Sequence, residues 1–544
     1  MEKQIEQIAQ KIIERSPETK LDFDNAKRKV CGALKTKQPS NRELLKAYQN
    51  LVKKKSIEPD KNFLILMRKA DIRTLSGIAV ITSLTKPYAC PGQCVYCPTE
   101  ARMPKSYLAS EPAAARALSL KFDPYFMMQR RIKMLESNGH PCDKIEYIIK
   151  GGTWNAYPLK YQYWFVLESF KACNDLTRRQ KSKSHQHINT STLGKLQELL
   201  EIEQEYNDKK AKYKIIGLTL ETRPDAVSEK TILHMRRQGC TRIELGLQAP
   251  DDRILNLVKR GHTVQQCKDA MILLRSAGFK VDLHFMPDLP GTTPKHDVEM
   301  YKFLFTDPGF KPDMVKIYPN TVIKSAELHE WLEDGRYTPY GNKELFDALM
   351  KMKLATPRYC RISRLIRDIP TDEISAGNQI TNLREALAAE LEKQGKQCVC
   401  LRCREVGHTK THKPINPSIP YLFVDEYKTS GGTEYFLSFE DEGRNAVFGF
   451  LRLRLPSIQS SIINLQSLAF IRELHTYGQL VGIGKQDKSA SQHKGLGKRL
   501  VTEAENIARK NSFEKIAVIS GVGVRGYYRK LGYRKKGTYM VKTV

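Results

Sequence analysis

The chain has 544 residues, 40% hydrophobic and 28% charged, and its 90 Lys and Arg against 60 Asp and Glu give a formal charge of +30. It is too long for one hydrophobic core and too hydrophobic for wholesale disorder, and no apolar run reaches the roughly 18 residues of a membrane-spanning helix. Its first residues lack the apolar centre of a signal peptide, so we expect a cytoplasmic protein, and the positive charge favours a polyanionic partner.

Residues 1 to about 75 are predicted to form helices that carry basic clusters. Lysine and arginine gather at 27–29, 53–55 and 68–69. Such clusters neutralise the phosphates of a nucleic acid, so region 1–75 is the first candidate for RNA binding. Three arginines further along the chain are a second candidate surface: Arg361, Arg364 and Arg367.

Region 76–355 alternates short apolar strands with longer helical stretches. The expected strands cover 77–84, 144–150, 214–220, 242–248, 280–286 and 314–319. The clearest helix covers 261–277 and ends before Gly278. Six such units predict an α/β fold with an incomplete parallel (βα)6 barrel. The polar residues 174–212 are expected to form a surface insertion with a helix near 195–206.

A polar, cysteine-bearing bridge over 356–415 leads into a last region, 416–544, which is predicted to be an α+β domain. Its segment 416–420 reads as a linker. Leucines at 451, 453 and 455 alternate with Arg452 and Arg454, which predicts a sheet with one face in solvent. A helix over 493–510 and a strand over 515–520 follow.

The loop after the first expected strand holds Cys90, Cys94 and Cys97 in a CxxxCxxC motif. Soft thiolates at this spacing suit an iron–sulfur cluster or zinc, and three ligands leave one iron of a cubane cluster open. With Tyr96 before the last cysteine, the motif resembles the radical S-adenosylmethionine (SAM) superfamily. That resemblance implies a 4Fe-4S cluster whose open iron binds SAM and whose reduction releases a 5′-deoxyadenosyl radical. It also implies SAM contacts in the loops after the later strands, at Gly151, Gly152, Thr153, Arg223 and Gln248.

A second motif, Q-x-x-G-x-G over 492–497, opens the helix expected at 493–510. Small residues at a helix start expose backbone N–H groups, and the helix dipole favours a phosphate there. The order of this motif, the strand at 515–520 and the pair Tyr527–Tyr528 resembles the GNAT acetyltransferases, whose loop holds the pyrophosphate of acetyl-CoA. Either tyrosine could donate a proton to a departing thiolate or pack on CoA.

The succession of the two domains resembles the family of tRNA wobble-uridine carboxymethylation enzymes that includes the catalytic subunit of Elongator. The strings KPYACPGQCVYCP (86–98), DKIEYIIKGGTW (143–154) and EKIAVISGVGVRGYYRKLGY (514–533) carry the resemblance over nearly the whole chain. It implies that a radical formed on the acetyl methyl group adds to carbon 5 of uridine 34, and that thioester hydrolysis leaves a carboxymethyl group. The implied acetyl-CoA contacts are Lys144, Glu473, Leu474, His475, Thr476, Gln492, Gly495, Leu496, Gly497, Lys498 and Tyr528. Lys144 could equally be a surface lysine.

The bridge holds a second cluster, Cys398, Cys400 and Cys403. A structural zinc takes four ligands, so His408 or His412 is a candidate for the fourth, and three free thiols are the alternative.

The expected partner is a tRNA anticodon stem-loop with an everted base. Accessory subunits or a homodimer are possible, and no membrane is expected. Two other functions stay open: a protein lysine acetyltransferase, and a non-catalytic RNA-binding protein with a structural iron–sulfur cluster.

Overall fold

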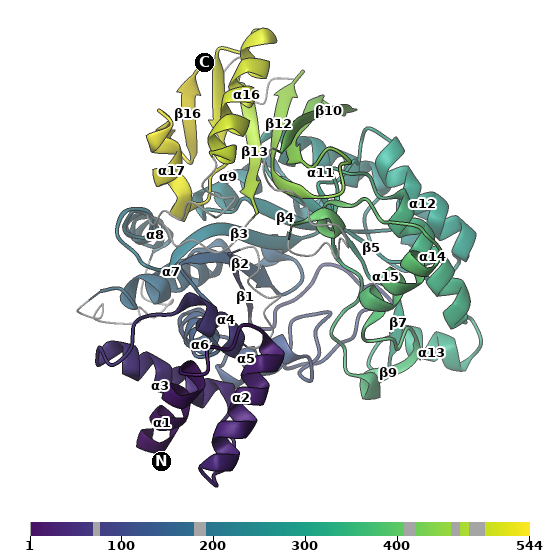
Figure 1. Ribbon diagram of the computed structural model, residues 1–544. Helices are drawn as coiled ribbons and strands as arrows, with labels where there is room; N and C mark the ends of the chain where they lie inside the picture. The colour runs from purple at the N-terminus through teal and green to yellow at the C-terminus, as the bar shows by residue number, and fades with distance from the viewer. Residues whose placement is uncertain (1, 69–76, 179–191, 407–419, 458–467, 478–494) are drawn as a thin grey trace.

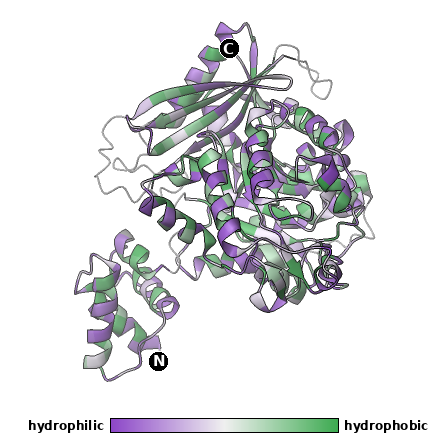
Figure 2. Cartoon of the chain, turned by 90° about the vertical axis from the view of Figure 1, so that its right-hand side faces the viewer, coloured by the Kyte–Doolittle hydropathy of each residue, from purple (hydrophilic) through white to green (hydrophobic). Residues whose placement is uncertain are grey.

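The computed structural model describes residues 2–68, 77–178, 192–406, 420–457, 468–477 and 495–544. The N-terminal part consists of four helices, α1 Glu2–Ile13, α2 Lys20–Ala33, α3 Asn41–Lys53 and α4 Lys61–Met67. They enclose a hydrophobic core of their own around Phe23, Leu44 and Phe63, and Figure 2 shows them set apart from the rest of the molecule. Arg68 is buried and its Nε donates to the carbonyl of Gly139 at 3.0 Å, so it joins these helices to the barrel instead of facing solvent.

The barrel strands form a parallel sheet in the order β1-β2-β3-β4-β5-β6-β8. Six confirm the predicted positions: β1 Ala79–Leu84, β2 Lys144–Lys150, β3 Lys214–Thr222, β4 Arg242–Gln248, β5 Lys280–Phe285 and β6 Met314–Ile317. A seventh, β8 Arg361–Arg364, pairs with β6 but lies in the stretch that we expected to be bridge. Three of its four residues are polar and only Ile362 is fully buried, so it lacks the apolar run by which strands are recognised.

Helices cover the outside of this sheet (Figure 1). They are α5 Pro112–Ser119, α6 Pro124–Glu136, α7 Leu159–Asp175, α8 Leu193–Lys209, α9 Glu229–Arg237, α10 Asp252–Leu257, α11 Val264–Ser276, α12 Pro294–Thr306, α13 Leu328–Glu333, α14 Asn342–Ala355 and α15 Leu383–Lys393. α11 and α8 confirm the two predicted helices. α8 is not a surface insertion, because Leu196 and Leu200 are buried and Asn174 of α7 donates to the carbonyl of Glu203 at 2.9 Å. Among the described residues, no helix is long and apolar enough to span a membrane.

The C-terminal domain is a second sheet, in the order β10-β11-β12-β13-β14-β16-β15. Its strands are β10 Tyr421–Thr429, β11 Gly432–Glu440, β12 Val447–Pro456, β13 Leu468–Thr476, β14 Lys515–Val518, β15 Arg534–Lys536 and β16 Tyr539–Thr543. Only β13 and β14 pair in parallel, whereas the other neighbours are antiparallel. Helix α16 Leu496–Lys510 packs its apolar side on β11 to β14, and the short helix α17 Arg525–Lys530 follows β14.

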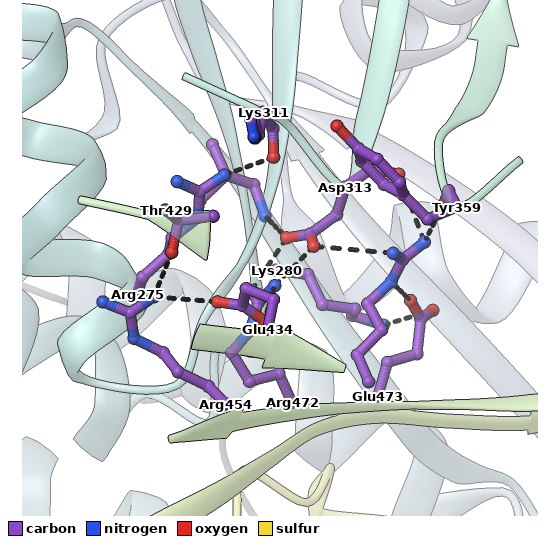
Figure 3. Close-up of polar contacts among 12 residues, drawn as sticks. Arg275, Lys280, Lys311, Asp313, Tyr359, Thr429, Glu434, Arg454, Arg472 and Glu473 are labelled. Atoms are coloured by element: carbon purple, nitrogen blue, oxygen red, sulfur yellow. Dashed lines mark hydrogen bonds and ion pairs between the residues drawn. The ribbon is translucent and has the colours of Figure 1, made fainter. Parts of the chain in front are cut away.

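The other face of this sheet is not in solvent, which corrects the expectation drawn from Arg452 and Arg454. Both side chains are fully buried, because this face packs on the amino ends of the barrel strands (Figure 3). Arg454 pairs with Glu434 at 2.9 Å, and Arg472 reaches across to Asp313 of the barrel at 2.8 Å. Alternation along a strand distinguishes the two faces of a sheet, but it does not show whether the polar face contacts water or a neighbouring domain.

Candidate active site

A cavity of about 860 Å³ lies inside the barrel. Cys90, Cys94 and Cys97 all line it, at the carboxyl ends of the strands, as predicted for the catalytic face of such a barrel. The cysteine loop is held on both sides: Val95 donates its N–H to the carbonyl of Val258 at 3.2 Å, and its own carbonyl accepts from Leu328 at 2.8 Å. The loop therefore has a fixed position over the cavity.

Arg260 makes the cysteine loop favourable for thiolates. Its Nη1 lies 3.5 Å from Sγ of Cys94, which is buried. A hydrogen bond from the Cys97 thiol and the charge of Arg260 lower the pKa of Cys94, although burial opposes this effect. Cys90 accepts from the N–H of Gly92 at 3.4 Å. Metal binding requires thiolates, so Arg260 supports ligation, and this residue was not identified from the sequence.

Most of the residues predicted to contact SAM surround the same cavity. Gly152, Thr153, Arg223 and Gln248 line it, whereas Gly151 packs behind them. Gly151 has a φ of +146°, and an added Cβ would lie 1.7 Å from Oγ1 of Thr85, so only glycine fits there.

Arg223 and Gln248 leave polar atoms without a protein partner. Arg223 forms two hydrogen bonds with Asp225, at 2.9 and 3.1 Å, but its buried Nη1 has no partner among the described residues. The same holds for Oε1 of Gln248, which sits at a strained φ of +79°. Buried polar atoms without partners are costly, so this pair indicates a polar ligand in the cavity.

The barrel interior also holds a charged cluster that sequence reasoning missed. Lys150 and Lys316 both pair with Glu244, and His284 Nε2 lies 3.4 Å from the same carboxylate. Glu221 accepts from the Tyr107 hydroxyl at 2.9 Å. Burial alone would raise the pKa of Glu244, but the two lysines hold it well below its ordinary value. Burial lowers the pKa of Lys316 to about 8, which puts a proton donor with a near-neutral pKa inside the cavity.

The sequence did contain a signal for this cluster. Each of the strands β2 to β6 is rich in apolar residues, yet each carries a charged or titratable residue that lines the cavity: Lys150, Glu221, Glu244, His284 and Lys316. Such a residue in a strand buried on both faces must point into the barrel, where it needs a partner. These strands were identified in the sequence by their apolar residues, and the charged residues within them were not considered separately.

A second cavity of about 440 Å³ lies between the amino ends of the barrel strands and the C-terminal sheet. Four of the residues for which the family resemblance implies acetyl-CoA contacts line it: Glu473, Leu474, His475 and Tyr528. The ladder between β13 and β14 ends at Ile471 and Val518, while β13 continues to Thr476. The last residues of β13 therefore present strand-edge groups towards the cavity, where the amides of an extended ligand can pair.

Two titratable residues of this cavity have strongly shifted pKa values. Burial would raise the pKa of Glu473, but Lys280 at 3.3 Å and Arg452 at 2.9 Å lower it to about 2. Burial lowers the pKa of His475 to about 4, so its imidazole is neutral. Nε2 of His475 has no partner among the described residues and is free to contact a ligand.

The start of α16 has the geometry expected of an anion-binding turn. Gly495 has a φ of +72° and directly precedes the helix, and a Cβ on Gly497 would lie 2.8 Å from the Tyr527 hydroxyl. Tyr528 is buried and lines the cavity, whereas Tyr527 is 39% exposed and lies over Gly497. The structure thus distinguishes the two tyrosines, which the sequence left as equals.

The remaining predicted acetyl-CoA contacts are placed less directly. Leu496 belongs to the hydrophobic core, and Lys498 is exposed on the first turn of α16. Lys144 and Thr476 are not among the residues that line either cavity, although Glu146, on the same strand as Lys144, lines both. Gln492 lies outside the described residues.

The two cavities meet inside the barrel. Five residues line both of them: Val80, Glu146, Arg242, Met314 and Arg361. Glu146 and Arg242 form an ion pair of 2.7 Å at this junction. Arg361 also pairs with Glu405, and Arg367 pairs with Glu111 at 2.8 Å, so neither is the free surface arginine that we expected for RNA contact.

The bridge cysteines converge. The sulfur atoms of Cys398, Cys400 and Cys403 lie within 4.8 Å of one another, close enough to share one metal ion. Sγ of Cys398 lies 3.2 Å from the carbonyl of Lys353 in α14, so the cluster packs against the barrel. His408 and His412 lie outside the described residues. The donor set fits three of the four ligands of a structural zinc.

Comparisons with known proteins agree with this geometry. The model of the radical SAM superfamily matches residues 84–304, and that of the radical SAM C-terminal domain matches 312–393. A protein of Methanocaldococcus infernus named tRNA uridine(34) acetyltransferase is 42% identical over 93% of this chain and 91% of its own. Human Elongator complex protein 3 is 36% identical over 88% of this chain and 86% of its own. The solved archaeal Elp3 of M. infernus, without its first 46 residues, is 38% identical and superposes with a TM-score of 0.73 over 87% of this chain and 100% of that one.

Proposed function

This chain belongs to the radical SAM family of tRNA uridine(34) acetyltransferases and Elongator complex protein 3, and we propose that it installs a carboxymethyl group on carbon 5 of the wobble uridine of tRNA. The group would derive from acetyl-CoA. One observation carries the proposal: the cavity under the cysteine loop and the cavity beside the C-terminal sheet share five lining residues and so adjoin each other. Adjoining cavities place an acyl donor and a radical source close enough to act on one base.

The larger cavity fits a 4Fe-4S cluster and SAM. Cys90, Cys94 and Cys97 would hold three irons and leave the fourth for SAM, which supplies the radical chemistry when bound. Nη1 of Arg223 and Oε1 of Gln248 are suited to pair with polar groups of SAM, because both atoms are buried and have no partner in the described part of the chain. Gly152 and Thr153 line the same cavity.

The smaller cavity fits the pantetheine arm of acetyl-CoA. The free edge of β13 would pair with its amides, and the turn at Gly495 and Gly497 would hold the pyrophosphate at the start of α16. Tyr528 is the tyrosine placed to protonate the departing CoA thiolate, because it lines the cavity. Burial raises its pKa above the ordinary value, which keeps the phenol protonated.

The N-terminal helices are the proposed docking surface for the tRNA anticodon stem-loop. Arg28, Lys29, Lys53 and Lys55 are exposed, whereas Lys54 pairs with Glu6 at 2.7 Å. The wobble base would leave its stack and enter the larger cavity.

We also propose that Cys398, Cys400 and Cys403 bind a structural zinc, with its fourth ligand outside the described residues. Metal analysis of the variant in which all three cysteines are replaced by alanine tests this proposal.

Mass spectrometry of wobble nucleosides tests the function directly. The anaerobically purified protein is incubated with reductant, SAM, acetyl-CoA and tRNA, and each component is omitted in turn. We expect 5-carboxymethyluridine only in the complete mixture. Acetylation of lysine peptides without any change in the tRNA would instead support the lysine acetyltransferase alternative.

A further inference from the structure

Asn320 lines the larger cavity immediately beyond β6, at the same edge of the barrel as the cysteine loop. It is 1% exposed. The backbone N–H of Asn320 donates to the carbonyl of Pro287 at 2.9 Å. A Cβ on Gly377 would lie 2.7 Å from the carbonyl oxygen of Asn320, so two other segments hold the backbone of Asn320 in place. The position of Asn320 is therefore set by the fold before any ligand binds.

The orientation of the Asn320 amide follows from the hydrogen bonds of Tyr337. The Tyr337 hydroxyl donates its one proton to the carbonyl of Asp288 at 2.7 Å, because a carbonyl can only accept. The phenol oxygen must then accept in its second contact, 3.1 Å from Nδ2 of Asn320. Burial raises the pKa of Tyr337, so the phenol stays protonated. The NH2 group therefore faces Tyr337, and the amide cannot flip without losing this bond.

The opposite atom of this amide, Oδ1 of Asn320, is buried and has no donor among the described residues. An acceptor that is fixed in orientation and left without a partner costs free energy unless a ligand supplies an N–H or O–H group. The cavity around it is the one in which the target base is proposed to react. On its Watson–Crick edge, uracil has one donor, N3–H, between the acceptors O2 and O4, whereas cytosine has an acceptor at N3 and its donor at the N4 amino group.

We propose that Asn320 reads the Watson–Crick edge of the target base, with its Oδ1 accepting a hydrogen bond from N3–H of uracil. This assignment rests on the proposed function and adds a determinant of base specificity to it. Cytosine in the same position would set its N3 acceptor against Oδ1, and its only donor, the N4 amino group, would lie where uracil carries O4. A site built for a donor at N3 rejects a base that has an acceptor there. Tyr337 is a positioning residue, because it prevents the amide from turning its NH2 group towards the base.

Three proteins test this reading: the wild type, Asn320→Ala and Tyr337→Phe. Each is given tRNA that carries uridine or cytidine at position 34, and the ratio of the two modification rates is measured. Asn320→Ala should lower the rate on uridine by about tenfold, the loss of one hydrogen bond, and lower the uridine-to-cytidine ratio. Tyr337→Phe removes only a hydroxyl; it should lower the ratio too, because the amide becomes free to flip. A general disturbance of the fold would lower both rates together and leave the ratio unchanged.

A second measurement separates the base from the other donor that could reach Oδ1, the adenine amino group of SAM. Reductive cleavage of SAM without tRNA should be the same in Asn320→Ala and in the wild type. A higher KM for SAM together with an unchanged uridine-to-cytidine ratio would overturn the assignment to the base. Absence of any modified nucleoside with the wild type would overturn the proposed function, and this assignment with it.

Discussion

Asp313 of the barrel and Arg472 of the C-terminal sheet form a two-point ion pair in which neither side chain is exposed to solvent. Nη1 of Arg472 lies 2.8 Å from Oδ2 of Asp313, and Nη2 lies 2.5 Å from Oδ1 (Figure 3). Oδ2 of Asp313 also accepts from the N–H of Val281, next to the start of β5. The pair therefore fixes the sheet that carries the proposed acetyl-CoA site on the strands that carry the charged cluster.

Asp313→Asn should destabilise the protein by about 3–5 kcal/mol, because the buried Arg472 loses one of its two carboxylate partners and must share the other, Glu434, with Arg454. Urea unfolding at neutral pH measures the change. Asp334→Asn is the matched control: its partner Arg336 is about half exposed, and the stability change should be small because solvent screens such surface pairs. Equal stabilities for the two variants would mean that the buried pair does not hold the domains together.

The stability provided by Glu473 should disappear in acid. Its pKa in the folded protein is about 2, below the ordinary value of 4.5, so the unfolded state binds the proton more readily. The contribution is thus complete above pH 4.5 and is lost as the pH falls towards 2. The free energies of unfolding of wild type and Glu473→Gln, measured over this range, should converge as the pH falls. A constant difference would contradict the ion pairs with Lys280 and Arg452.

Replacing Cys90, Cys94 or Cys97 by alanine should remove the cluster, because each supplies one of its three protein ligands. Iron and sulfide analysis and the visible absorbance of anaerobic samples measure the loss. Cys267→Ala is the control, since this cysteine is fully buried in α11, away from the cavity. Full iron content in the triple variant would disprove the site.

Gly497→Glu should abolish acetyl-CoA binding without unfolding the protein. The new side chain would start 2.8 Å from the Tyr527 hydroxyl and bring a negative charge to the proposed pyrophosphate site. Isothermal titration calorimetry with acetyl-CoA measures binding. Gly194→Glu is the control, because it places the same charge in α8, where nothing lies within 4 Å of the added Cβ. This variant should bind acetyl-CoA normally. Normal binding by Gly497→Glu would move the pyrophosphate site elsewhere.

Binding of tRNA should weaken steeply with salt, with a log–log slope of about −0.9 for each duplex phosphate that the protein neutralises. Deletion of residues 1–75 should reduce both the affinity and the slope. Acetyl-CoA binding should survive the deletion, because the N-terminal helices have a separate core. Filter binding at several salt concentrations measures the slope, and an affinity independent of salt would rule out this surface.

The sequence by itself determined the parts of the protein that depend on neighbours along the chain. The strands β1 to β6, the helix α11 and the start of α16 follow from apolar periodicity, caps and glycines, which act within a few residues. The spacing of Cys90, Cys94 and Cys97 identified the cysteine loop for the same reason, since all three lie in a single turn-rich segment.

Only the tertiary structure decided which side chains meet across long separations. Arg452 looks like a surface residue along its strand, and it is buried because another domain covers it. β8 became a barrel strand through pairing with β6, not through its own composition. The orientation of Asn320 depends on Tyr337 and Asp288, which come from other segments. The local pattern of apolar and polar residues indicates whether a residue prefers burial. The partner that forms a hydrogen bond with a buried polar atom is determined only when the chain has folded.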